Sequence, residues 1–396
     1  MKKLKPSCLP AVAFVLVLAL LFVIGIRSFL VSAYVGSDYL HGFSAETFDA
    51  TEKYFNEAVP TRYFFYDINS IFYRITNKRM KGNDYRLNNG HLAYAIEKED
   101  VTPYADAVAA LSDYVQTTLN KPFLYVQFPF KIDPNDPQLP PGGEDYSHQN
   151  TEEFLNRIKA KGVPVYDLRA YFNETRPDHY SLFYRTDHHW KAETGFLAAK
   201  ELNRYLTAQD AAFAVDERVF DQNSYQAETR DNFLGRLGLR FGPYFCGYDS
   251  FSAISPKYAL DLAAYNVNGK LLHRGGAEGT VLFPKHLTYS SPYNCSMYCY
   301  YMDGDPDYRR LVNRTQGLKL SPKKLLIIKD SFANAMVPYL IYGYEEVTIV
   351  DMRSLKTPLT EVIEQADPDL VMVAYNPGAL IPSEARMFEF FESDRP

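Results

Sequence analysis

The sequence predicts an α/β domain built on a parallel sheet with helices on both faces, and two observations indicate this. From about residue 105 onward, short apolar runs alternate with segments of helical periodicity. Three of the runs, Leu325–Ile328, Val347–Val350 and Leu370–Ala374, are largely apolar and are separated by helical segments. Such runs are typical of strands buried on both faces of a parallel sheet with right-handed crossovers.

The other elements follow in a regular order. Ala105–Leu119 has the apolar spacing of a helix, and Phe123–Phe128 reads as a buried strand that ends before Pro129. The further expected elements are a helix over Thr151–Ala160, a strand over Val163–Tyr166, and helices over Trp190–Leu206, Phe332–Tyr342 and Leu359–Gln365.

Residues 222–318 interrupt this rhythm. They are rich in Gly, Tyr and Asn and contain short β-like pieces such as Thr280–Phe283. We interpret them as a β-rich insertion in an α/β domain of residues 105–396, preceded by a membrane-proximal segment of residues 34–104.

Residues 1–33 read as a cytoplasmic tail and a transmembrane signal-anchor. Leu9–Ile26 has no charged side chain and follows Lys2, Lys3 and Lys5. As a helix this run is about 27 Å long, close to the thickness of the hydrocarbon core. The lysines should stay in the cytoplasm, which predicts a single-pass cell-membrane protein with an extracytoplasmic domain. The alternative is a signal peptide cleaved after Val31–Ala33.

The charge balance argues against nucleic acid as a partner. The 396 residues include 42 Lys and Arg against 48 Asp and Glu, a net charge of -6, whereas phosphate binding needs a basic surface. The 32 Tyr and 27 Phe, against one Trp, suit stacking on sugars but equally suit packing in an ordinary core.

Ser331 is the candidate nucleophile. It follows the buried strand Leu325–Ile328 and precedes a helical segment, so its hydroxyl should lie at the carboxyl edge of the sheet, near helix N–H groups able to hold an oxyanion. Asp330 and Ser331 are also ordinary helix N-cap residues, which is the alternative interpretation.

Asp187 and His189 are the candidate partners of that serine. A serine hydroxyl needs a base, and an imidazole base needs a carboxylate that fixes its tautomer. There are two alternatives: Asp187 caps the next helix, or it forms a metal site with His188 and His189. We expect the His188 side chain to point away from its neighbour.

Three residues at the ends of other strands are further candidates. Asn376 could donate to an oxyanion or simply form a turn before Pro377. Tyr375 and Arg353 are expected to bind substrate near the same edge, although Arg353 could equally be a surface ion-pair residue.

Asp187-His188-His189-Trp190 resembles the motif that names the bacterial DHHW proteins, which are similar to the SGNH-hydrolase-like O-acetylation proteins of alginate biosynthesis. In those relatives an Asp-x-His-Trp motif precedes the serine, a permuted order compared with ordinary SGNH esterases. The order here is the same, with Lys329–Phe332 in place of the Gly-Asp-Ser block. Tyr375–Pro377 departs from the usual Gly-x-Asn-Asp block.

The resemblance implies an SGNH-hydrolase-like, flavodoxin-like fold and a serine-dependent O-acetyltransferase or esterase that acts on a cell-surface or secreted polysaccharide. Ser331 would attack an acetyl ester, His189 would take and return the proton, and Asp187 would orient His189. A membrane-bound O-acyltransferase is the expected source of acetyl groups, and neither cofactor nor metal is expected. The alternative is an inactive polysaccharide-binding or accessory protein of an O-acetylation system.

Overall fold

The computed structural model describes residues 62–391 apart from 177, 290 and 295. Its contacts divide the chain into two compact units, Met1–Asn77 with Phe241–Phe245, and Lys78–Arg240 with Cys246–Pro396. The predicted anchor and cleavage site lie outside the described residues. Among the helices that are described, none combines the length and the apolar character needed to span a membrane.

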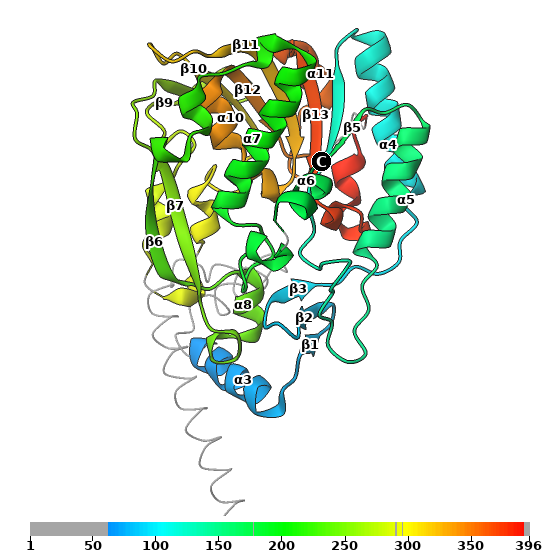
Figure 1. The fold of residues 1–396 in the computed structure, drawn as a ribbon, viewed down its shortest axis with the longest axis vertical. Coiled ribbons are helices and arrows are strands. Elements are labelled where there is room, and N and C mark those ends of the chain that lie inside the picture. Colours follow the sequence, from blue (N-terminus) through cyan, green and yellow to red (C-terminus); the bar gives the residue numbers. More distant parts are fainter. Residues whose placement is uncertain (1–61, 177, 290, 295, 392–396) are drawn as a thin grey trace, which may run out of the picture. The chain divides into compact units, whose positions relative to one another are not determined.

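The larger unit is built on an eight-stranded sheet (Figure 1) with the order β5-β4-β13-β11-β12-β10-β8-β9. The first five strands pair in parallel. They are β5 (Val165–Asp167), β4 (Phe123–Gln127), β13 (Leu370–Tyr375), β11 (Ser321–Lys329) and β12 (Tyr344–Val350). The α/β class is therefore confirmed.

The prediction of a parallel sheet is wrong for the remaining three strands, because the central sheet is mixed. β10 (Tyr308–Asn313), β8 (Leu262–Tyr265) and β9 (Leu271–Gly275) pair antiparallel and extend the sheet beyond β12. All three come from residues 222–318. β9 is largely exposed, so it lacks the continuous apolar run that marks a buried strand. The same segment also forms a two-stranded ribbon of β6 (Tyr225–Phe233) and β7 (Asp249–Pro256).

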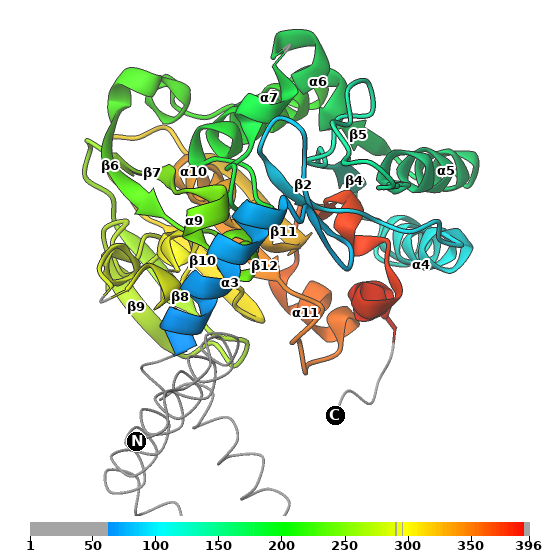
Figure 2. The ribbon, with the colours of Figure 1, turned by 90° about the horizontal axis from the view of Figure 1, so that it is seen from below.

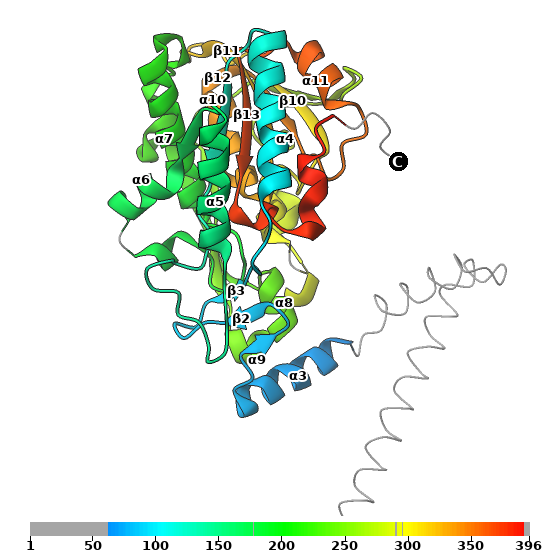
Figure 3. The ribbon, with the colours of Figure 1, turned by 90° about the vertical axis from the view of Figure 1, so that its right-hand side faces the viewer.

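Helices cover both faces of the sheet (Figures 2 and 3). Alternate strand residues point to opposite faces: Tyr125, Ile328 and Val373 join one apolar core, and Val126, Ile327 and Met372 join the other. The first core is closed by α4 (Thr102–Asp113), α5 (Ser147–Ala160) and α11 (Leu359–Ala366). The second is closed by α6 (Leu168–Thr175), α7 (Ala192–Gln209) and α10 (Val337–Gly343).

Two predicted helices are divided in the structure. The segment predicted as Ala105–Leu119 is α4 followed by a π-helical turn, η3 (Tyr114–Thr118). The segment predicted as Phe332–Tyr342 is a 3-10 turn, η11 (Ser331–Ala335), followed by α10. Pro338 explains the second division, because it lies in the first turn of α10, where a missing N–H costs no helical hydrogen bond.

A small antiparallel sheet lies near the carboxyl ends of the parallel strands (Figure 1). It consists of β1 (Met80–Lys81), β2 (Asp84–Arg86) and β3 (Leu92–Tyr94). The Tyr94 ring contacts the rings of Phe130 and His188. This sheet therefore covers the edge at which the candidate residues lie.

Further short elements connect these parts. They are α8 (Arg236–Phe241), α9 (Pro243–Cys246) and the 3-10 turns η4 (His179–Leu182), η5 (Ala211–Phe213), η6 (Glu217–Phe220), η7 (Gln222–Ser224), η8 (Pro284–Leu287), η9 (Pro292–Asn294), η10 (Met297–Tyr300), η12 (Pro377–Ala379) and η13 (Pro382–Phe388).

The described part of the smaller unit is α3 (Arg62–Thr76) with Phe241–Phe245. The Tyr73 ring packs against the rings of Phe241 and Phe245, and the Ser70 hydroxyl accepts a hydrogen bond from the Phe245 N–H at 2.9 Å. Gly242 permits this approach, since a Cβ there would lie 2.4 Å from the Ser70 Cβ.

Gly195→Ala should destabilise the larger unit. A Cβ at Gly195 would lie 2.4 Å from the Ala335 carbonyl oxygen, so α7 and η11 would have to move apart. We expect the free energy of unfolding in urea to fall by about 1–3 kcal/mol. Gly276→Ala is the matched control, since the nearest atom to its Cβ is 4.0 Å away, and it should change stability by less than about 0.5 kcal/mol. Equal stability of the two variants would contradict this packing.

Candidate functional site

Asp187, His189 and Ser331 form a continuous hydrogen-bonded chain. His189 Nδ1 lies 2.6 Å from Asp187 Oδ1, and His189 Nε2 lies 2.7 Å from Ser331 Oγ. Asp187 and His189 are buried, whereas Ser331 is partly exposed. The structure therefore brings together three residues that the sequence separates by up to 144 positions (331 minus 187).

The loop that carries Asp187 and His189 is fixed through Thr186. The Thr186 N–H and hydroxyl both donate to Asp249 Oδ2 at 2.6 Å, and the Thr186 hydroxyl accepts from the Gly235 N–H at 3.0 Å. Gly235 has no room for a side chain, because a Cβ there would lie 2.3 Å from the Asp187 Cβ. The position of Asp187 is therefore fixed by the hydrogen bonds of Thr186 on one side and by the close backbone of Gly235 on the other.

Lys131 supports the same loop from the protein interior. Its Nζ donates to the carbonyl oxygens of Tyr184 at 2.6 Å, Arg185 at 3.1 Å and Asp187 at 2.6 Å. Burial lowers the pKa of Lys131 to about 7, although Asp249 and Asp187 oppose this shift. Three carbonyl acceptors match the three N–H groups of an ammonium, so the charged form gives the loop its full set of hydrogen bonds.

Ser331 is positioned by the carboxylate next to it. Asp330 Oδ1 accepts from the Phe332 N–H at 2.8 Å, so Asp330 caps η11 as the alternative interpretation expected. Asp330 Oδ2 accepts from both the backbone N–H of Asn376 at 2.5 Å and its Nδ2 at 2.6 Å. Burial raises the pKa of Asp330, and these hydrogen bonds oppose the rise.

Two aromatic residues restrict the movement of His189 and Ser331. The Tyr298 ring stacks on the His189 imidazole, with centroids 3.8 Å apart and planes at 10°. The Tyr298 hydroxyl lies 3.2 Å from the carbonyl oxygens of both Ser331 and Phe332, and Trp190 Nε1 donates to the Phe332 oxygen at 2.8 Å. One set of contacts therefore fixes both the imidazole plane and the serine backbone.

The ionisation of Asp187 decides which histidine nitrogen carries a proton. Burial acts to raise the pKa of Asp187, but the neighbouring imidazoles of His189 and His188 together outweigh this effect. The net pKa of Asp187 therefore lies well below the usual range. An ionised carboxylate only accepts hydrogen bonds, so the neutral His189 ring has its proton on Nδ1 and leaves Nε2 to accept the Ser331 proton.

The three further candidates at strand ends lie in different surroundings. Asn376 lies beside Asp330, and its Oδ1 accepts from the Gly378 N–H at 2.6 Å. Tyr375 points into the core on the α4 and α5 face, where its hydroxyl donates to the Met387 carbonyl oxygen at 2.9 Å. Arg353 forms ion pairs with Asp351 at 2.5 Å and Asp305 at 3.1 Å. The structure thus engages Tyr375 in core packing and Arg353 in ion pairs.

His188 does not point away from its neighbour, and that expectation is wrong. Its ring centroid lies 3.8 Å from that of His189, and its ring meets the Tyr94 ring edge-on at 5.8 Å. Burial and the adjacent His189 lower the pKa of His188 to about 3. The loop turns sharply enough at Asp187–His189 to place both imidazoles on one side.

This turn also bears on the metal alternative. The ligand atoms of Asp187, His188 and His189 lie within 4.8 Å of one another, so they are near enough to share an ion. The Asp187 oxygens, however, already accept from the His189 N–H, His189 Nδ1 and the Arg236 N–H. A metal on this set would have to replace the hydrogen bond that orients His189.

Sequence reasoning missed several supporting residues. Tyr298 lies in the segment without periodicity, 33 positions before Ser331, and carries no motif. Lys131 and Tyr94 likewise reach the site only through the tertiary fold. The one available signal was that Lys131 follows the predicted buried strand Phe123–Phe128 by only three residues, since a charge is costly so close to a buried strand.

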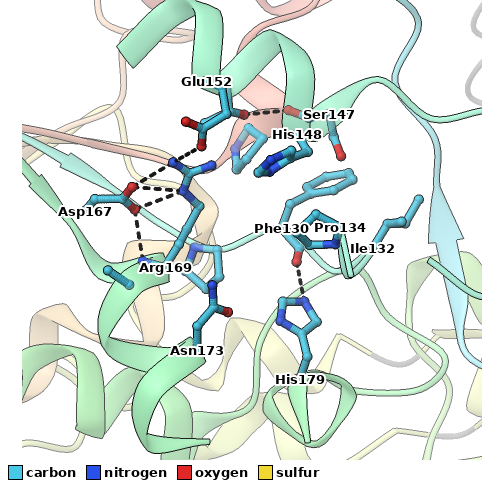
Figure 4. Close-up of a pocket in the computed structure, with 14 residues that line it drawn as sticks. Phe130, Ile132, Pro134, Ser147, His148, Glu152, Asp167, Arg169, Asn173 and His179 are labelled. Atoms are coloured by element: carbon cyan, nitrogen blue, oxygen red, sulfur yellow. Dashed lines mark hydrogen bonds and ion pairs between the residues drawn. The ribbon is translucent and has the colours of Figure 1, made fainter. Parts of the chain in front are cut away.

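A cavity of about 170 Å³ lies at the same edge of the sheet, beyond the ends of β4 and β5 (Figure 4). Arg169 lies on its wall between Asp167 and Glu152, at 2.7 Å from each carboxylate. The Phe130 ring links the cavity to Tyr94, which contacts His188. Residues that line it include Phe130, Ile132, His148, Arg169, Asn173 and Pro377.

Lys131 should make stability depend on pH. An exposed lysine titrates near 10.5, whereas burial lowers the pKa of Lys131 to about 7. Between these values the unfolded chain binds more protons than the folded one, so the free energy of unfolding should rise with pH. The contribution of Lys131 is at most about 1.4 kcal/mol per pH unit.

Urea unfolding at pH 7.5 to 9.5 measures this slope. Lys131→Met should remove it, while Lys161→Met, at an exposed lysine, should leave it unchanged. Parallel curves for the wild type and Lys131→Met would contradict the assignment.

Comparison with known proteins shows which protein family and which solved structures this chain resembles. Residues 97–242, which include Asp187 and His189, match the model of a family described as SGNH hydrolase-like domain, acetyltransferase AlgX. No curated protein matches the chain.

Three solved structures share the fold. PatB1 from Bacillus cereus is 20% identical with a TM-score of 0.61, over 78% of this chain and 100% of that chain. A structure of the same protein with a sulfonyl adduct has a TM-score of 0.59 at 20% identity, over 77% and 97%. A DHHW family protein from Eubacterium siraeum DSM 15702 is 19% identical with a TM-score of 0.57, over 78% and 97%. The predicted resemblance to DHHW proteins and SGNH-hydrolase-like O-acetylation proteins is thus confirmed, and the chain has an SGNH-like α/β fold with a mixed central sheet.

Proposed function

We propose that this protein is an extracytoplasmic serine-dependent O-acyl transferase or esterase that moves acetyl groups on or off a cell-surface or secreted polysaccharide. The observation that carries the proposal is the Asp187–His189–Ser331 chain, with Ser331 Oγ 2.7 Å from His189 Nε2. The match to an SGNH hydrolase-like acetyltransferase domain supports the same chemistry.

In the proposed reaction, Ser331 Oγ attacks the carbonyl carbon of an acetyl ester while His189 Nε2 takes the hydroxyl proton. The ionised Asp187 stabilises the resulting imidazolium. Collapse of the tetrahedral intermediate releases the alcohol, which receives the proton from His189, and leaves an acetyl group on Ser331. A sugar hydroxyl or water then attacks this ester, with His189 again as base, and frees the serine.

Asn376 is proposed as an oxyanion donor. Its Nδ2 has two N–H groups, and Asp330 Oδ2 accepts from this nitrogen at 2.6 Å. Because Asp330 also caps the turn that begins at Ser331, the amide is tied to the serine through one carboxylate. The second N–H would donate to the developing oxyanion.

The cavity beside β4 and β5 is proposed to bind the acceptor sugar. β4 is two strands away from β11 in the sheet order, which corresponds to about 10 Å. A sugar chain lying across the carboxyl edge could therefore reach Ser331 and the cavity with neighbouring residues. Asn173 and His148 on the wall supply hydrogen-bonding groups that suit hydroxyls.

The cellular setting is part of the same proposal. Leu9–Ile26 would anchor the protein in the cell membrane, and a membrane-bound O-acyltransferase would deliver the acetyl groups. The alternative is a catalytically inactive polysaccharide-binding or accessory protein, which would keep the fold without forming an acetyl-serine.

Substitution of the hydrogen-bonded chain tests the mechanism. Ser331→Ala and His189→Ala should each lower turnover of a small acetyl ester by at least about 1,000-fold, and the double variant should lose little more, because the residues act as a unit. Asp187→Asn should be severe but less complete. Ser354→Ala, at an exposed serine, is the matched control and should keep full activity.

The same preparations separate the alternatives. A sulfonyl fluoride should label Ser331 of the wild type, as detected by peptide mass spectrometry. Full activity in Ser331→Ala would disprove the mechanism, and an inactive wild type without labelling would favour the accessory role. Damage from His188→Ala equal to that from His189→Ala, together with loss of activity on chelation, would favour a metal site.

The acceptor cavity has its own test. Asn173→Trp should fill the cavity and raise the KM for an acetylated or acceptor oligosaccharide by about 10-fold or more, with kcat/KM for the small ester unchanged. Asn156→Trp, at an exposed asparagine of α5 outside the cavity, is the matched control. An unchanged oligosaccharide KM in Asn173→Trp would show that the acceptor binds elsewhere.

A further inference from the structure

Helix α3 presents a broad apolar face to its surroundings. The face is spaced i, i+1, i+4, i+7, i+8 and i+11, and at 100° per residue its members fall within an arc of about 120°. Their exposed fractions lie between 41% and 78%. They are Phe64, Phe65, Ile68, Ile71, Phe72 and Ile75.

The contacts of α3 within its own unit use the opposite side. Ser70 and Tyr73 are buried against Phe241–Phe245, and their directions lie about 160° and about 140°, respectively, from the middle of the apolar face. Packing in this unit therefore accounts for the buried side and leaves the apolar face exposed. Six large apolar side chains on one face form the kind of patch that marks an interaction surface.

We propose that this face lies on a lipid bilayer, with α3 parallel to the membrane surface. Interfacial helices combine a face of Phe, Ile or Leu with a polar or basic remainder. The apolar face of α3 has no charged member, and Asn69 and Thr76 follow it on one side of the helix and Asp67 and Arg74 on the other.

The charge of the surrounding sequence also favours an anionic lipid surface. Between Asp67 and Asp84 the chain has no acidic residue, but it has four basic ones, Arg74, Lys78, Arg79 and Lys81. Basic residues near a membrane surface are attracted to anionic headgroups.

The sequence before α3 brings the helix to such a surface. Leu9–Ile26 has the length and composition of a membrane anchor, and 35 residues (27–61) separate it from Arg62. A tether of this length keeps α3 at a high effective concentration near the bilayer. The anchor would therefore keep the apolar face of α3 next to lipid, whereas a separate protein partner would have to be recruited.

Depth-dependent fluorescence quenching tests the proposal in the full-length protein. Trp190 is the single tryptophan and is fully buried, so the wild type gives the background signal. Ile75→Trp and Phe72→Trp are two independent reporters on the apolar face. Asn69→Trp, on the same helix but about 100° from the middle of the face, is the matched control.

The protein would be reconstituted in vesicles of phosphatidylcholine and phosphatidylglycerol with brominated acyl chains. The added tryptophan of both reporters should lose at least half of its emission to the bromines and resist aqueous iodide, and the control should be quenched less by bromine. Quenching by iodide but not by bromine would place the face in water. Protection from both quenchers would show that protein covers it, either residues 1–61 or a partner. Either result would overturn the proposal.

Discussion

The Asp330 carboxylate joins the carboxyl ends of β11 and β13, and the position of Ser331 depends on it. One oxygen accepts from the Phe332 N–H, and the other accepts from the backbone N–H of Asn376 and from one N–H of its side-chain amide. A buried anion is costly unless it is hydrogen-bonded, and these three donors offset part of that cost. Removing the carboxylate would leave three donors without an acceptor and would free the turn at Ser331 from the neighbouring strand.

A second buried carboxylate organises the other half of the site in the same way. Asp187 accepts from the backbone and ring of His189 and from the Arg236 N–H. Lys131 Nζ donates to the carbonyl oxygen of Asp187 and so supports the same loop from the protein interior. The two halves meet where Trp190 Nε1 donates to the Phe332 carbonyl oxygen. The 2.7 Å contact between His189 and Ser331 is thus a consequence of separately fixed elements, which is the preorganisation that the proposed acyl transfer would need.

The sequence predicted the parts of this arrangement that depend on local pattern. The strands β11 and β13 were recognisable because both faces are buried, and Ser331 because it directly follows one of them. The alternation of side chains along a strand would have corrected the prediction that Tyr375 binds substrate. Residue 375 shares the face of Val371 and Val373, which pack against α4 and α5. The antiparallel strand β10 carries Arg309 and Arg310 at half-buried positions, so its place in the main sheet could not be recognised from the sequence. Tyr298 was not predictable either, because only the tertiary fold stacks it on His189.

The distribution of burial is consistent with the catalytic role proposed for this site. Asp187, His189, Asp330 and Asn376 are each at most 8% exposed, whereas Ser331 is partly open. Two ionisable carboxylates and an imidazole in such a place reduce stability unless every hydrogen bond is made, and well-packed apolar side chains could fill the same volume at no such cost. The buried hydrogen-bonded path from Asp187 through His189 ends at the partly exposed hydroxyl of Ser331. A serine nucleophile needs that arrangement, because its base must be oriented and shielded while its oxygen remains within reach of an ester.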